Sequence, residues 1–339
     1  MTTFRITTPD DYVLARDVCS YGYFLLEPNH WDPVGLVFTT TMLLGAKGRA
    51  VTLRMGQSAG ASGSKKRERA HTSSSLKELA GRPLVVKADV ALSAAEKKIA
   101  RGAIERMLNL NETKERIGAF HKLDKRFKRT GRGRLMRSPT LFEDVLKTVT
   151  SCNVQWPSTI IMNRRLCEVV GRKSASGRYA FPSAGALAKM GAALLRERCR
   201  VGYRDARMIE LARMFATGEI DGAWVENPAT SDEELWDAML EWPGIGPYAA
   251  ANIMQLLGRY HRLPLDSESV RHGRDLLGFK GTPKQIMKRV HRHYEPLGEH
   301  KFRSYWFELW EFYEKKRGPA WTWERETTGK TFTAAQLTE

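Results

Sequence analysis

The sequence predicts an α+β protein that is mostly α-helical. Two early segments have strand patterns: RAVTLRM (49–55) alternates between apolar and polar residues, and PLVVKADVAL (83–92) is rich in β-branched residues. From residue 93 nearly to the end, apolar residues instead recur at helical spacing. With 339 residues, 42% of them hydrophobic, the chain is long enough for two domains or one large domain with a substantial core.

Capping residues predict where two of the helices begin. Ser93 with Glu96 forms a capping-box pattern, and Ser231 with Glu234 forms a second one before DEELWDAMLEW. Amphipathic stretches predict three further helices, over 138–156 from Ser138-Pro139, over 157–171 after a break at Pro157, and over 204–218, ending at Gly218.

Three segments have no such periodicity. Residues 56–77 are rich in Gly, Ser and charge, which predicts a mobile loop within the N-terminal part. The polar tail, 318–339, is expected to fray. The basic run KLDKRFKRTGRGRLMR (122–137) suits either phosphate contact or a solvated connecting loop.

Composition and charge point to a nucleic-acid partner. The 55 Lys and Arg residues exceed the 38 Asp and Glu residues, which gives a net charge of +17. Such a balance favours a polyanionic partner. The four cysteines are far apart and form no C-x-x-C pair, which argues against a zinc or iron–sulfur site and favours a reducing compartment. The sequence shows no secretory signal and no apolar run of membrane-spanning length, so we expect a cytoplasmic (nucleoid) or nuclear protein. We also expect that it needs no cofactor.

The stretch EWPGIGPYAAANI (241–253) predicts two helices joined by a tight turn. Gly244 and Gly246 lack a Cβ, so they can take left-handed angles and let another backbone approach. The amides around Gly244, Ile245, Gly246 and Tyr248 would point outward at a helix N-terminus, which suits a phosphate oxygen. The carbonyls of the hairpin would equally suit a monovalent cation. By itself, PGIG is also compatible with an ordinary αα-corner.

The spacing between this hairpin and the acidic residue that follows it is informative. Asp266, in LPLDSESVRHG (263–273), lies twenty residues after Gly246 and just before a helical segment. Taken alone, it would be a plain N-cap. The combination of PGIG, an Ala-rich helix and this aspartate resembles the helix-hairpin-helix (HhH-GPD) DNA glycosylases, and in particular the 3-methyladenine DNA glycosylase II and 8-oxoguanine DNA glycosylase branches.

The resemblance extends over roughly residues 135–315. The segments TSCNVQWPSTIIMNRRLCEVVG, FPSAGALA and VGYRDARMIELARMF occur in the order expected of those branches. The resemblance implies a helical two-domain glycosylase core over 131–317, preceded by an N-terminal antiparallel β-sheet domain over 1–130. It also implies a monomer that binds double-stranded DNA containing a damaged base and flips that base into a cleft.

The resemblance assigns the chemistry to Asp266. A carboxylate beside C1′ stabilises the oxocarbenium-like transition state and orients water. Family members that also cleave the strand have a lysine two residues after the second hairpin glycine, where this chain has Tyr248. We therefore expect a monofunctional glycosylase without lyase activity, since a phenol cannot form a Schiff base.

Base flipping also requires groups that fill the gap in the duplex. The resemblance implies that Asn153 fills it, that Tyr203 wedges into the stack and that Arg204 reads the opposite base. Phe312, within YWFELWEFYE, matches the aromatic residue that stacks on the flipped base, although this run is also a good amphipathic core helix shared with Trp306 and Trp310. Tyr248 would form a wall of the base pocket.

Two departures weaken the match to the 8-oxoguanine branch. YGYFLLEP (21–28) stands where that branch has G-Q-x-F-R-W, and Pro157-Ser158 stand where it has an arginine. With aromatic Tyr248, this favours an aromatic cleft for alkylated, cationic purines. The alternatives are an 8-oxoguanine-type glycosylase, a glycosylase-lyase that uses a lysine elsewhere, and a non-catalytic DNA-binding protein, which would not need Asp266.

Overall fold

The computed structural model describes residues 1–45, 47–57 and 76–331. Most of the loop predicted over 56–77 therefore lies outside the described residues, and Gln57 belongs to a strand. None of the described helices is both long and apolar enough to span a bilayer.

The strands form one antiparallel sheet near the N-terminus, in the order β1-β5-β4-β3-β2. Their bounds are Thr2–Ile6 (β1), His30–Asp32 (β2), Val37–Leu44 (β3), Arg49–Gln57 (β4) and Leu84–Ala88 (β5). Helix α3, Ala94–Met107, begins at the predicted capping box of Ser93 and Glu96 and buries Ile104 in the same core as Leu53 of β4. The structure thus confirms an α+β fold with an antiparallel sheet.

The rest of the described chain is helical. The helices are α1 (Leu14–Val18), α4 (Lys114–Leu123), α5 (Leu141–Ser151), α6 (Trp156–Val170), α7 (Ala184–Ala188), α8 (Ala192–Cys199), α9 (Asp205–Thr217), α10 (Gly222–Glu226), α11 (Asp232–Leu240), α12 (Pro247–Leu256), α13 (Ser267–Asp275), α14 (Pro283–Tyr294), α15 (Lys301–Arg317) and α16 (Arg325–Thr331). Thr140, not Ser138, is the N-cap of α5, because its side chain accepts the Glu143 amide. The capping box of Ser231 and Glu234 opens α11 as predicted.

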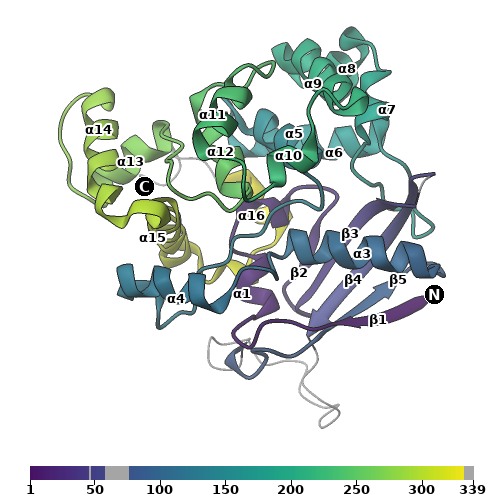
Figure 1. Cartoon of the computed structure of the whole chain (residues 1–339), viewed down its shortest axis with the longest axis horizontal. Coiled ribbons are helices and arrows are strands. Elements are labelled where there is room, and N and C mark those ends of the chain that lie inside the picture. Colours follow the sequence, from purple (N-terminus) through teal and green to yellow (C-terminus); the bar gives the residue numbers. More distant parts are fainter. Residues whose placement is uncertain (46, 58–75, 332–339) are drawn as a thin grey trace.

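Two hydrophobic cores organise these elements. One joins the sheet, α1 and α3 to the C-terminal helices α13, α14 and α15, so both ends of the chain share it. The other lies within residues 141–254 and forms the helical group α5 to α12, at the top of Figure 1. Arg106 of the first unit forms an ion pair of 2.8 Å with the fully buried Asp144 of the second.

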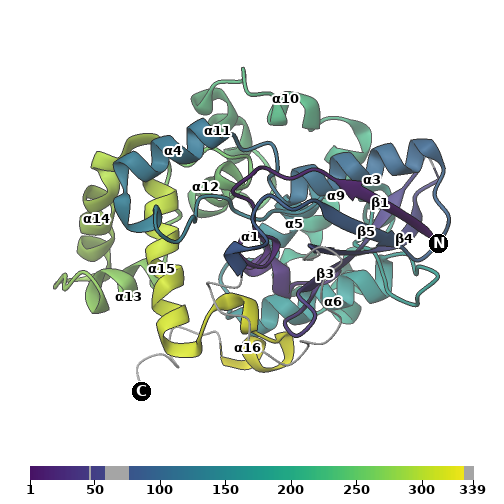
Figure 2. The same ribbon diagram turned by 90° about the horizontal axis from the view of Figure 1, so that it is seen from below.

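Residues 318–328 pack against the rest of the protein, although the sequence suggested that the tail 318–339 frays; residues 332–339 lie outside the described residues. Trp321 and Trp323 are buried, and the Trp31 indole N–H donates to the Trp321 carbonyl at 2.8 Å. Arg325, at the start of α16, donates to the Leu25 carbonyl at 2.9 Å. In Figure 2, α16 lies at the lower edge of the view, and it contacts α6. The two indoles supply the apolar surface that a polar tail would lack.

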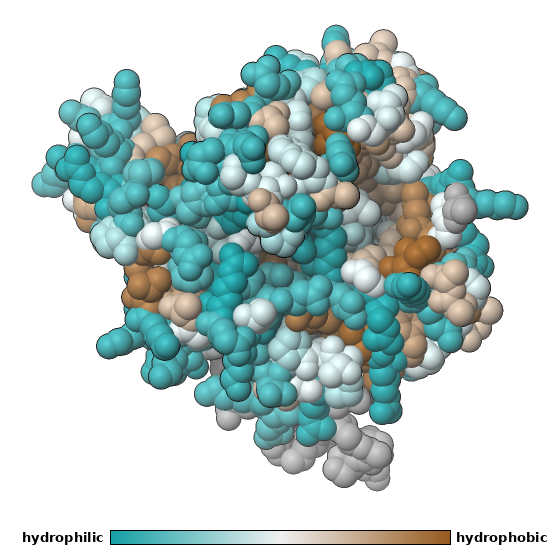
Figure 3. Space-filling view, in the orientation of Figure 1, coloured by the Kyte–Doolittle hydropathy of each residue, from teal (hydrophilic) through white to brown (hydrophobic). Residues whose placement is uncertain are grey.

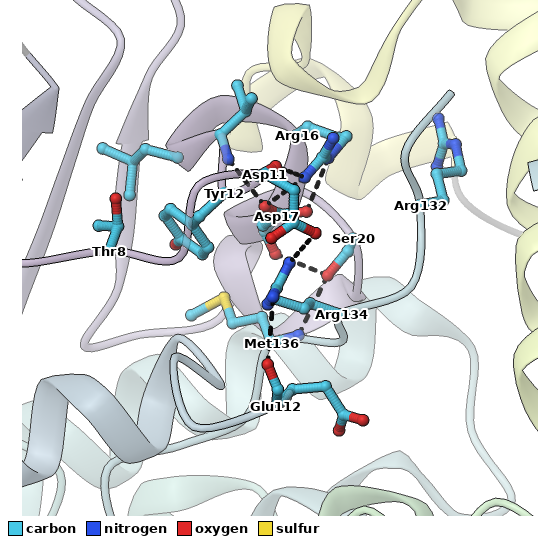
Figure 4. A network of polar contacts seen from close by, with 12 residues as sticks. Thr8, Asp11, Tyr12, Arg16, Asp17, Ser20, Glu112, Arg132, Arg134 and Met136 are labelled. Carbon is cyan, nitrogen blue, oxygen red and sulfur yellow. Dashed lines mark hydrogen bonds and ion pairs between the residues drawn. The ribbon is translucent and has the colours of Figure 1, made fainter. Parts of the chain in front are cut away.

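Two arginines of the basic run 122–137 are buried, whereas Lys122, Lys125, Lys128 and Arg129 are exposed. Arg134 is 1% exposed and bridges Asp11, at 2.7 Å, to the Glu112 carbonyl, at 3.1 Å (Figure 4). Arg132 pairs with Glu314. These arginines are therefore neither a solvated connection nor free to bind phosphate.

Candidate active site

The stretch 241–253 folds as the helix-hairpin-helix that its glycines predicted. Helix α11 ends at Leu240, and α12 begins at Pro247 with Gly246 as its N-cap. Ile245 is buried in the core of the helical group and anchors the turn. Because glycine offers no side-chain cap, the first amides of α12 are left for an external acceptor.

The two hairpin glycines differ in backbone conformation. Gly244 has φ +79°, the left-handed region that favours glycine. Gly246 has φ −100° and ψ −178°, an extended conformation that any residue adopts, so the prediction of left-handed angles is wrong there. No atom lies within 4 Å of a Cβ built at Gly246, so its surroundings are open. The backbone at position 246 therefore needs no glycine, and the approach to the start of α12 is open.

Asp266 is the N-cap of α13 and also faces a cavity. Its Oδ1 accepts the Glu268 amide at 3.0 Å and the Ser269 amide at 3.1 Å, while its own amide donates to the Ser269 hydroxyl at 3.1 Å. The Ser269 hydroxyl also hydrogen-bonds the Tyr305 hydroxyl at 2.9 Å. Oδ1 is thus held by two backbone amides, and none of these contacts involves Oδ2.

The cavity beside Asp266 has a volume of about 370 Å³ and collects side chains from distant parts of the chain. Tyr248, from the first turn of α12, lines it together with Asp266. Its other aromatic walls are Tyr21, Tyr23, Trp156, Tyr305, Trp306, Trp310 and Tyr313. Among the described residues, no Lys or Arg lines it, whereas Glu268 does. The cavity is therefore aromatic and acidic.

The surroundings shift the acidity of the groups in this cavity. Burial raises the pKa of the Asp266 carboxyl, while hydrogen bonding from the Ser269 amide and from the Tyr248 hydroxyl opposes part of that rise. Burial, reinforced by the nearby Asp266 charge, raises the pKa of Tyr248, which keeps this phenol neutral.

One wall of the cavity comes from the N-terminal segment around Tyr21. The indole N–H groups of Trp306 and Trp310, on α15, donate to the carbonyls of Ser20 at 2.8 Å and Cys19 at 3.0 Å. A Cβ built at Gly22 would lie 2.8 Å from the Trp156 ring, so glycine is needed for this close approach. Sequence reasoning missed Tyr21 and Trp156 as pocket walls, although the aromatic run YGYF was a usable signal.

Asn153 and Tyr203, the two residues that the resemblance assigns to base flipping, lie together in the structure. Asn153 is exposed and has φ +53°, and its side-chain amide donates to the Tyr203 hydroxyl at 3.3 Å. Tyr203 is 53% exposed, a large aromatic side chain presented to solvent. The cavity residues Ser151, Val154 and Gln155 flank Asn153 in the chain, so this pair lies at the edge of the cavity.

Arg204 is not placed to read a base. It is 5% exposed, and its guanidinium donates to the carbonyls of Val149, Val201 and Cys152. All three acceptors belong to the protein backbone, so in this structure Arg204 holds the loop that presents Asn153.

Phe312 does not line the Asp266 cavity. It is partly buried on α15, with the Arg271 guanidinium 4.1 Å from its ring centre. Its neighbour Tyr313 lines the cavity instead and donates to Glu268 Oε1 at 2.8 Å. The helical phase of α15 decides this, since adjacent residues point in different directions.

A larger hollow, of about 690 Å³, is separate from this site. It lies between α3 and the helices α5 and α7, where Figure 3 shows hydrophobic atoms at the surface, and its apolar walls include Met42, Ile99, Phe142 and Phe181. It contains neither the hairpin nor Asp266. Among the described residues, no group of three or more His, Cys, Asp and Glu side chains could hold a metal ion.

Solved structures with this fold are DNA glycosylases. The 3-methyladenine DNA glycosylase from Archaeoglobus fulgidus matches with a TM-score of 0.65 and 19% identity, over 91% of this chain and 98% of that one. The Clostridium acetobutylicum 8-oxoguanine glycosylase/lyase matches with a TM-score of 0.61 and 16% identity, over 90% of this chain and 98% of that one. MBOgg1, in complex with a low-affinity DNA ligand, matches with a TM-score of 0.63 and 18% identity, over 92% of this chain and 96% of that one.

No protein-family model and no curated protein matches the sequence. The evidence from known proteins therefore concerns the three-dimensional arrangement, and it covers nearly the whole length of both partners in each comparison. The chain has the α+β fold of the helix-hairpin-helix DNA glycosylases.

Proposed function

We propose that the protein is a DNA glycosylase that removes a damaged purine from double-stranded DNA and leaves an abasic site. The observation that carries the proposal is the meeting of Asp266 and Tyr248 at one aromatic cavity, directly behind the hairpin. A grip for DNA alone would need the hairpin amides but not a carboxylate at an aromatic cavity. The volume of about 370 Å³ lies within the roughly 300–1,000 Å³ typical of small-ligand sites.

The reaction follows from the position of the carboxylate. The C1′–N bond breaks, its electron pair leaves with the base, and positive charge develops on the sugar. The Asp266 carboxylate stabilises that charge electrostatically in a site shielded from water. It then accepts a proton from the water molecule that adds to C1′. Tyr248 offers no amine, so no covalent imine forms and the strand stays intact.

The substrate we propose is an alkylated purine that carries a positive charge. Eight aromatic side chains and two carboxylates line the cavity, and no lysine or arginine of the described ranges does. Aromatic faces attract cations, and the carboxylates add to the attraction. A cationic base also leaves as a neutral molecule and needs no protonation. An 8-oxoguanine substrate is the second candidate, favoured by the C. acetobutylicum enzyme of the same fold.

The test is a panel of duplex oligonucleotides, each with one lesion: a 7-alkylguanine, 3-methyladenine, hypoxanthine or 8-oxoguanine. Alkali then cleaves the strand wherever a base has been excised, and a control without protein is run for each duplex because hot alkali by itself opens 7-alkylguanine and cleaves there. We expect excision of the cationic lesions first and no strand cleavage before alkali. Excision of 8-oxoguanine alone would identify the second candidate. Absence of excision from every duplex, with DNA binding intact, would favour a non-catalytic DNA-binding protein.

A further inference from the structure

The exposed edge beside the cavity contains one arginine that no part of the site described so far uses. Arg207, in the first turn of α9, is exposed. Within the described parts of the chain it forms no ion pair with a carboxylate, in contrast to Arg213 on the same helix, which pairs with Glu210 and Glu219. An unpaired exposed guanidinium is available to an anion from outside the protein.

The stem of Arg207 lies against the hairpin turn. A Cβ built at Gly244 would be 2.8 Å from Arg207 Cδ and 3.4 Å from its Cβ. Any side chain at position 244 would therefore displace Arg207, in addition to straining a residue with φ +79°. The absence of a side chain at Gly244 thus creates the space in which Arg207 extends along the hairpin.

The head of Arg207 lies at the exposed aromatic ring. Its guanidinium carbon is 5.7 Å from the ring centre of Tyr203, whose hydroxyl accepts from Asn153. Asn153, Tyr203, Arg207 and Gly244 thus form one continuous edge, although they come from three separate parts of the chain. The pair proposed to enter the duplex and the turn proposed to hold its backbone are joined by this one cationic side chain.

We infer that Arg207 binds a phosphodiester of the DNA strand between the inserted Tyr203 and the hairpin. This inference rests on the proposed DNA-binding function. It adds a residue that holds the hairpin and the inserted Tyr203 on the same DNA strand. Guanidinium groups recognise phosphate oxygens through paired N–H donors, and the ring of Tyr203 limits where this guanidinium can point. Since a phosphate carries no sequence information, Arg207 contributes to every duplex alike.

Arg207→Gln is the direct test, with Arg207→Lys and Arg213→Gln as matched variants. Affinity is measured against salt concentration for an undamaged duplex and for the same duplex with a tetrahydrofuran abasic analogue. Losing one phosphate contact reduces the slope of log K against log salt by about 0.9 and weakens binding about eightfold at 0.1 M salt. We expect this for Arg207→Gln on both duplexes. Arg207→Lys, which keeps the charge, should retain most of the slope, and Arg213→Gln should match wild type.

The outcomes separate this inference from the proposed function. If wild type binds the duplexes and Arg207→Gln binds them with unchanged slope, Arg207 contacts no phosphate and the inference is wrong. A loss confined to the abasic duplex would also overturn it, because Arg207 would then act only through Tyr203. If wild type binds no duplex, the proposed function itself fails. Unchanged melting temperatures are expected, since Arg207 is exposed and unpaired in the protein.

Discussion

Burial raises the pKa of the Asp266 carboxyl. The hydroxyl of Tyr248, in the first turn of α12, opposes part of that rise by hydrogen bonding. The two residues lie eighteen positions apart and line the same cavity. In the proposed reaction Asp266 supplies the charged carboxylate, and Tyr248 stands at the position where the resemblance places the lysine of lyase enzymes. Most of the predictions below follow from this pair.

Asp266→Asn should abolish base excision and leave DNA binding intact, because it removes the charge with almost no change in shape. Single-turnover excision is the measurement. A rate above about a tenth of wild type corresponds to a cost under ~1.4 kcal/mol and would exclude Asp266 as the catalytic carboxylate. The variant should melt no lower than wild type at neutral pH, because Asn also caps helices and burial disfavours the charged form.

The pH dependence of excision should report the raised pKa of Asp266. Only the carboxylate stabilises positive charge, so the rate falls as pH drops through this pKa, at a higher pH than for an ordinary aspartate with a pKa of 3.8. Tyr248→Phe removes the hydrogen bond that lowers this pKa, so the acid limb of the profile should move to still higher pH. If the acid limb does not move in Tyr248→Phe, the phenol does not lower the pKa of the Asp266 carboxyl.

Tyr248→Lys tests the missing amine. The new side chain would extend into the cavity beside Asp266, where burial lowers the pKa of an amine and favours its neutral, nucleophilic form. We expect borohydride to trap part of this variant on damaged DNA, and to trap no wild-type protein. Trapping of wild type would mean that a lysine elsewhere acts as a lyase. A folded, DNA-binding variant that never traps would show that position 248 does not reach the sugar.

Gly246→Glu tests the hairpin as a phosphate site. The surroundings of Gly246 are open and its backbone is extended, so a side chain there fits without strain. The variant should therefore fold normally and lose affinity for damaged and undamaged duplexes alike, since the new carboxylate repels phosphate at the start of α12. Gly246→Ala is the control and should bind nearly as well as wild type. Normal binding by Gly246→Glu would place the DNA backbone elsewhere.

Arg204→Met tests whether Arg204 reads the base opposite the lesion or only stabilises the protein. The buried guanidinium is held by backbone carbonyls, and leaving such acceptors unpaired costs roughly 1–3 kcal/mol each. We expect a lower melting temperature and an equal loss of excision whichever base stands opposite the lesion. If stability is unchanged and excision becomes indifferent to the opposite base, Arg204 acts on the DNA.

The sequence by itself determined the local elements. The capping boxes at Ser93 and Ser231, the strand over 49–55 and the hairpin at Gly244 are set by short-range hydrogen bonding and backbone freedom, which residue type and spacing encode directly. The N-cap position of Asp266 is also readable from the sequence, whereas its catalytic role comes from the resemblance to the glycosylases and stays a prediction.

Only the tertiary structure decided which side chains meet. The basic run 122–137 reads as an external patch, yet Arg134 is buried between Asp11 and Glu112, because ion pairing between distant segments outweighs the local preference for solvent. Tyr21 lines the cavity because both ends of the chain share one core, and Tyr313 rather than Phe312 faces it because of the helical phase of α15. Charge and aromatic content are properties of the sequence, but the direction in which a side chain points depends on packing between elements far apart along the chain.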